Sequence, residues 1–127
     1  MLTVEEIKGK FTEELIGLTD EAIEDLIEQA EYVIHYATRG FLHNQILYYS
    51  ENTTDTHWYD HYVAIKRKAI MAQLEYWFHV GPETDIVARY RSYRVGESKI
   101  EYDLTTLAPR AYRILRMGGA MNIGVTL

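Results

Sequence analysis

The chain has 127 residues, a formal net charge of −6 at pH 7 and no cysteine. A chain of this length folds as one domain and can bury about two-thirds of the surface that its unfolded form exposes. The lack of cysteine excludes disulfide bonds, thiol catalysis and thiolate metal ligands. No apolar run approaches the roughly 20 residues of a membrane span, and the first residues do not resemble a signal peptide. We therefore expect a single soluble, intracellular domain over residues 1–127.

The charge is distributed unevenly along the chain. Residues 1–31 carry a net charge of −8, residues 32–88 carry −2 and residues 89–116 carry +4. An acidic beginning and a basic end favour head-to-tail contact between copies, or docking on an acidic partner. Two solvated faces of opposite sign would explain the same pattern, so both interpretations remain open at this point.

Two helices are predicted in the first third of the chain. Thr3 and Glu6 have the spacing of a capping box, so a short helix should follow Thr3 and run to about Lys10. A second helix should begin at residues 18–20 and stop at Gly40, because glycine commonly follows a helix end. Its apolar residues keep the i, i+3, i+4 spacing of one helical face without a break: Ala22, Ile23, Leu26, Ile27, Ala30, Val33, Ile34 and Ala37.

The middle of the chain predicts a loop followed by the central helix. Residues 41–59 mix apolar and polar side chains, and residues 50–55 are all polar, so we expect a long mobile connection here. Residues 60–80 form the longest run with helical spacing, and their apolar side chains spread over roughly half of the circumference. A surface helix has a narrower apolar face, so this helix should be covered on two sides.

The last third predicts a β-hairpin and a final helix. Residues 91–103 alternate around Gly96-Glu97, a pair typical of a two-residue turn. A short helix should begin near Pro109, face inward with Ala111, Tyr112, Ile114 and Leu115, and end at Gly118-Gly119. An extended tail should follow over residues 119–127. The predicted fold is mainly α: a small helical bundle around one long central helix, with the hairpin and a short C-terminal helix.

One cluster has the composition of a metal site. His57 and His61 stand at i, i+4 with Asp60 between them, and histidines at that spacing can share one face of a helix. The glutamate that follows the first histidine of a zincin motif is missing, and helix packing explains these residues as well. We expect no metal, no cofactor and no catalytic residue here. The alternative is a small metal-binding protein or hydrolase that uses these three residues.

Tyrosine and arginine interleave over residues 89–94. Such a pattern can stack on single-stranded nucleic acid, but tyrosine and arginine also anchor protein interfaces, which suit an acidic chain better. In the final helix, Arg110, Arg113 and Arg116 repeat every third residue with no acid nearby in the sequence, so we expect carboxylates of a partner to meet them. The residues predicted to make interface contacts are Arg91, Tyr93, Arg94, Gly96, Lys99, Arg110, Arg113 and Arg116.

Taken in order, several segments resemble the head-tail connector (adaptor or head completion) proteins of long-tailed bacteriophages and their prophages. The resemblance covers most of the chain and rests on order and spacing. Its segments are a helix ending near Arg39-Gly40-Phe41, a long helix with Ala69, Gln73 and Tyr76, the strand pattern SYRVGESKIEY at residues 92–102, and the closing helix LAPRAYRIL at residues 107–115.

This resemblance implies a non-enzymatic structural protein of the virion, located at the head-tail interface and made in the cytoplasm of the bacterial host. Such proteins form a homo-oligomeric ring, expected to be twelve-fold, beneath the portal after DNA packaging. The implied partners are the portal protein and a tail-side head completion or stopper protein. Double-stranded DNA would pass through the channel without sequence-specific binding, and no membrane would be involved.

Overall fold

The computed structural model describes residues 2–51, 54–79 and 107–121. These residues are mainly helical, as predicted, and none of them lies in a strand. None of the helices in these ranges is long and apolar enough to cross a membrane. The helices are α1 (Val4–Lys10), α2 (Asp20–Ala37), α3 (Phe41–Ser50), α4 (His57–His79) and α6 (Pro109–Met117).

The hairpin predicted at residues 91–103 lies outside the described residues, as does the end of the predicted tail from residue 122 onward. Because the described residues hold no strand, the β part of the predicted fold is not borne out. The helical part agrees closely with the prediction, since the expected central helix at residues 60–80 is observed as α4.

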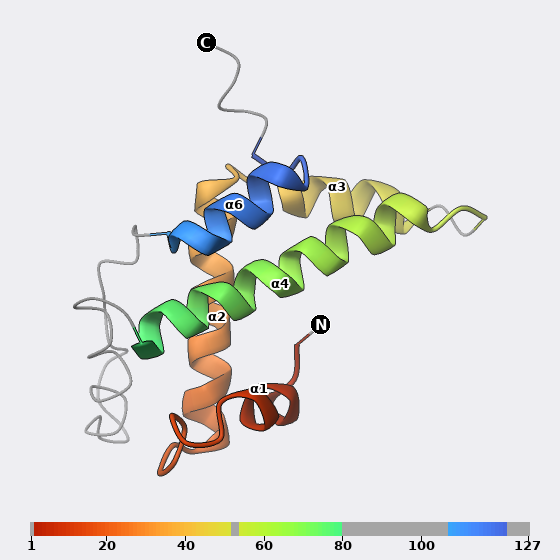
Figure 1. The fold of residues 1–127 in the computed structure, drawn as a ribbon. Coiled ribbons are helices and arrows are strands. Elements are labelled where there is room, and N and C mark those ends of the chain that lie inside the picture. The colour runs from red at the N-terminus through yellow and green to blue at the C-terminus, as the bar shows by residue number, and fades with distance from the viewer. Residues whose placement is uncertain (1, 52–53, 80–106, 122–127) are drawn as a thin grey trace.

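Helix α4 is the element on which the others pack. It runs across α2 and lies alongside α6, with α3 against its first half (Figure 1). The broad apolar circumference of α4 therefore has a structural cause, because the helix is covered on more than one side. The prediction that two sides would be covered is confirmed.

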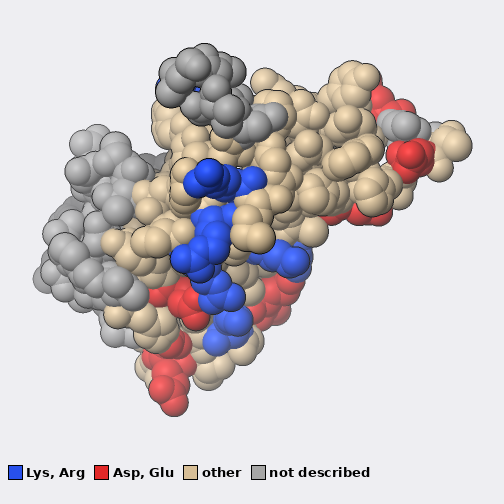
Figure 2. All heavy atoms as spheres, turned by 45° about the horizontal axis from the view of Figure 1, so that its top comes forward, with Lys and Arg blue, Asp and Glu red and all other residues tan. Residues whose placement is uncertain are grey.

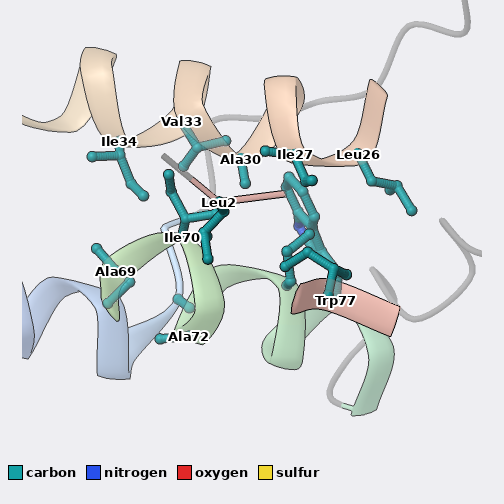
Figure 3. Close-up of a cluster of buried hydrophobic side chains, with 14 of the residues drawn as sticks. Leu2, Leu26, Ile27, Ala30, Val33, Ile34, Ala69, Ile70, Ala72 and Trp77 are labelled. Atoms are coloured by element: carbon teal, nitrogen blue, oxygen red, sulfur yellow. The ribbon is translucent and has the colours of Figure 1, made fainter. Parts of the chain in front are cut away.

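The core lies mainly between α2 and α4. Figure 3 shows Trp77 pointing from α4 toward α2, with Ile70 of α4 facing the same helix. Both side chains are almost fully buried, at 1% and 0% exposure. Burial of large apolar side chains contributes about 1.5–3 kcal/mol each, so this layer stabilises the crossing of the two long helices. The α2 residues that face it include Leu26, Ile27, Ala30, Val33 and Ile34.

The long mobile connection predicted at residues 41–59 is wrong for most of its length. Residues 41–50 form α3, and α4 already begins at His57. The prediction failed because α3 lacks a clean apolar stripe: most of its residues are apolar or aromatic, yet only Leu42 is buried. The sequence of α3 has no clear helical period, and its packing against α4 stabilises it as a helix.

The helix ends follow the local signals. Thr3 caps α1 in a complete capping box with Glu6, as predicted. The stop predicted at Gly40 is also found, although α2 ends at Ala37. Arg39 and Gly40 both have positive φ, at 54° and 78°, so the chain turns sharply there before α3 begins.

Helices α4 and α6 are joined by polar contacts and by one close approach. The buried Gln73 side chain accepts a hydrogen bond of 2.8 Å from the Ala108 amide just before α6. His61 makes a hydrogen bond of 3.0 Å to the Gly118 carbonyl at the other end of α6. A Cβ added at Gly118 would lie 2.8 Å from Ile65 Cγ1, so a larger residue there would force the Ile65 side chain to move.

We predict that Gly118→Ala destabilises the fold by about 1–3 kcal/mol, because the new methyl group overpacks against Ile65. The matched control is Gly9→Ala in α1, where an added Cβ meets nothing within 4 Å. That change should stabilise by about 0.5–1 kcal/mol, since alanine is the better helix former. Urea unfolding of both variants checks this, and equal stability of the two would contradict the tight α4–α6 contact.

Candidate interface: a basic groove beside an acidic face

The predicted interface residues fall into two groups. Arg91, Tyr93, Arg94, Gly96 and Lys99 lie outside the described residues. Arg110, Arg113 and Arg116 lie on α6, and all three are exposed. The structure therefore describes only the three α6 arginines of the predicted interface.

Helix α6 is amphipathic, and its arginines do not all point the same way. Ala111 and Leu115 are fully buried against the rest of the fold. Arg113 and Arg116 lie on the opposite, outer side, as their spacing from these residues requires. Tyr112, which was predicted to face inward, is 43% exposed and belongs to the outer side as well.

The sequence has no acid near the three arginines, as noted above, but Arg110 finds one from a distant part of the chain. Its guanidinium donates a hydrogen bond of 3.0 Å to Glu75 Oε1 of α4. The two residues are 35 positions apart, so the sequence around α6 could not show the pairing. Arg113 and Arg116 have no acid partner within the described ranges 2–51, 54–79 and 107–121.

A basic groove of about 530 Å³ lies between α1, α4 and α6. Figure 2 shows lysine and arginine side chains gathered in a stripe on this face, with acidic side chains beside them. Four cations and one carboxylate line the groove, and its other lining side chains are apolar. The lining residues are Lys10, Arg67, Lys68, Glu75 and Arg110, together with Leu2, Met71, Ala72 and Ile114.

The cations of this face differ in whether an acid neutralises them. Arg67 is paired with Glu6, as Arg110 is with Glu75. Lys10 and Lys68 have no acid partner among the described residues. Together with Arg113 and Arg116 on the outer side of α6, they leave a basic surface that its own chain does not neutralise. Such a surface attracts a partner that carries carboxylates or phosphates.

An acidic groove adjoins this basic surface. It runs between the start of α1 and α2 and is lined by Glu21, Glu24, Asp25, Glu28 and Glu31, with Leu2, Thr3, Val4 and Ile27. Leu2 lines both grooves. Lys66 of α4 forms an ion pair of 3.4 Å with Glu31, which lines the acidic groove. Among the described residues, an acidic groove and a basic groove therefore lie side by side in the fold.

The residues of the alternative metal site make other contacts. The His61 ring nitrogen is engaged by the Gly118 carbonyl, and the Asp60 carboxylate accepts a hydrogen bond of 3.1 Å from Thr56 Oγ1. The His57 amide donates to the Asp55 carboxylate at the start of α4. Within the described part of the chain, no group of three or more His, Cys, Asp and Glu side chains is placed to hold a metal ion. These residues organise the helix start and its contact with α6.

The sequence analysis missed the groove because its cations come from separate segments. Arg67 and Lys68 follow Lys66 in the middle of α4, and this run of three basic residues was an available signal. Lys10 and Arg110 join them only when α1 and α6 pack around α4. Comparison with protein-family models, curated proteins and solved structures finds no match, so the argument for function depends on these surfaces.

We predict that Arg67→Gln raises the pKa of the Glu6 carboxyl. The hydrogen bond from Arg67 is the main cause that holds this pKa below its ordinary value of 4.5. Because the pKa is lowered in the folded state, the pair stabilises the protein above pH 4.5 and this contribution is lost as the pH falls through the folded pKa. An NMR titration of Glu6 measures the shift, and Lys68→Gln should leave the Glu6 pKa unchanged. An equal effect of both variants would show that total charge, not the pair, lowers it.

Proposed function

We propose that the protein is a structural subunit of the bacteriophage head-tail connector class, forming a ring between the portal and the tail-side proteins. The observation that carries the proposal is the outer side of α6. Arg113 and Arg116 lie there without an acid partner among the described residues, next to Met117, which is 82% exposed. A charged and apolar surface of this kind is suited to a protein interface, where arginine and methionine are enriched.

The proposed partners come from the resemblance of the sequence to connector proteins. The proposed type of contact, arginine with carboxylate, comes from the outer side of α6. The outer side of α6 would meet carboxylates of the portal or of a neighbouring subunit. Each exposed pair contributes at most about 1 kcal/mol, but a ring repeats the pair in every subunit. The assembly should therefore weaken as salt rises, because exposed charges are screened.

Two other functions have less support. A metal protein or hydrolase using His57, Asp60 and His61 has less support because no group of three or more His, Cys, Asp and Glu side chains is placed to hold a metal ion within the described part of the chain. A DNA-binding regulator would lay a phosphate backbone along the basic groove, but the chain has a net charge of −6 and an acidic groove adjoins the basic one, so an extended polyanion would be repelled.

We predict that the double change Arg113→Glu, Arg116→Glu abolishes attachment to filled phage heads and leaves the monomer folded. Both side chains are exposed, so their reversal costs the fold little, whereas it places like charges against the partner. Electron microscopy of heads incubated with each protein measures attachment, and circular dichroism measures folding.

The control for that experiment is Arg39→Glu, an exposed arginine at the corner between α2 and α3. This variant should attach like the unchanged protein. If the α6 double variant attaches equally well at low and at high salt, α6 is not the docking surface. If the unchanged protein does not bind heads or portal at all, the connector function itself is wrong.

A further inference from the structure

The end of the molecule where α3 meets α4 carries a cluster of aromatic side chains, which we call the aromatic tip and define as Tyr48, Tyr49, Trp58 and Tyr62. Tyr49 and Tyr62 are stacked, with ring centroids 6.1 Å apart and an angle of 17° between the rings. Trp58 lies 6.4 Å from Tyr49 and 6.1 Å from Tyr62. The rings of the aromatic tip therefore brace one another and form a preorganised surface.

This surface is open in the single chain. Tyr48 is 70% exposed, Trp58 is 46% exposed and Leu47 beside them is 54% exposed. The start of α4 and the end of α3 project from the rest of the bundle (Figure 1). Aromatic side chains held rigid and exposed at a projecting end are typical anchors of protein interfaces.

The charge around the aromatic tip restricts what it can bind. Residues 40–65 contain no lysine or arginine, and their acids are Glu51, Asp55 and Asp60. A nucleic acid or another acidic surface would be repelled there. The favoured occupant carries both cations and apolar side chains, and the basic groove of this same protein has both, since Lys10 and Lys68 line it together with Met71 and Ile114.

We propose that the aromatic tip of one copy docks in the basic groove of a second copy. This inference rests on the proposed ring and names the contact between its subunits. The tip cannot reach its own groove, because Trp58 and Lys68 lie on the same helix and are separated along its axis by about 15 Å. Two different surfaces of each copy are used, so the contact is head-to-tail and generates a ring or an open filament.

The rival occupant of the groove is the acidic face of α2 from another copy. That face adjoins the groove of its own chain, shares Leu2 with it and is tied to α4 by the Glu31–Lys66 ion pair. The aromatic tip lies apart from the groove and adds apolar anchors that the carboxylates of the α2 face lack. Both observations favour the tip.

Cross-linking tests the contact directly, because the natural chain has no cysteine. The double variant Glu51→Cys, Lys68→Cys, treated with a short bismaleimide, should give a ladder of covalent dimers, trimers and larger species. Each single-cysteine variant should stay monomeric on a denaturing gel. The matched variant Glu24→Cys, Lys68→Cys, which tests the α2 face, should give no ladder. Adding Tyr48→Ser should reduce the yield of the ladder about tenfold, as expected for loss of an anchor, whereas Tyr36→Ser, equally exposed on α2, should not.

Three outcomes overturn the proposal: a ladder only with Glu24→Cys, a dimer from Glu51→Cys alone, and no covalent product from any variant. The first would assign the groove to α2, and the second would show a symmetric tip-to-tip contact. The test uses purified protein without heads or portal. A ladder combined with failure to attach to heads would therefore refute the connector role alone, and attachment without a ladder would refute the tip contact alone.

Discussion

The burial of α4 on several sides is the constraint on which the rest of the structure depends. α2, α3 and α6 all contact it, and the α1 carboxylate Glu6 pairs with Arg67 on it. A helix enclosed in this way has to satisfy any polar group that it carries inside. Gln73 is fully buried. Its side-chain oxygen is satisfied by a hydrogen bond that the Ala108 amide donates just before α6. A buried amide without that partner would cost about 1–3 kcal/mol, so the polar residue fixes where α6 begins.

The same packing decides which charges remain available to a partner. The fold brings acidic segments against the basic triplet of α4, where Lys66 and Arg67 pair with Glu31 and Glu6. Arg110 is used in the same way by Glu75. Lys10, Lys68, Arg113 and Arg116 have no such partner among the described residues, and they form one basic surface around the groove and the outer side of α6. The net charge of −6 therefore conceals a locally basic surface.

α4 also sets the separation between the two surfaces proposed to meet in an assembly. Its first turns carry Trp58 and Tyr62 of the aromatic tip, and its middle carries Lys68 of the groove. A single straight helix holds these surfaces at a fixed distance and in a fixed relative direction. Head-to-tail contacts need such rigidity, because small errors in the angle between copies decide whether a ring closes. The apolar and aromatic composition of α3, which has only Leu42 buried, is consistent with the same role in contact.

The sequence by itself determined the helical class, the central helix and most helix ends, because those signals act over a few residues. Thr3 bonds Glu6 three positions away, and the apolar residues of α2 repeat at helical spacing. The sequence did not predict α3, because the apolar residues of α3 follow no clear period. It also did not predict which charged residues of the chain pair with each other. Glu6 and Arg67 are 61 positions apart, and His61 and Gly118 are 57 apart. Only the packing of α1 and α6 around α4 decided these contacts, because ion pairs and hydrogen bonds depend on distance in space and carry no periodic trace in the chain.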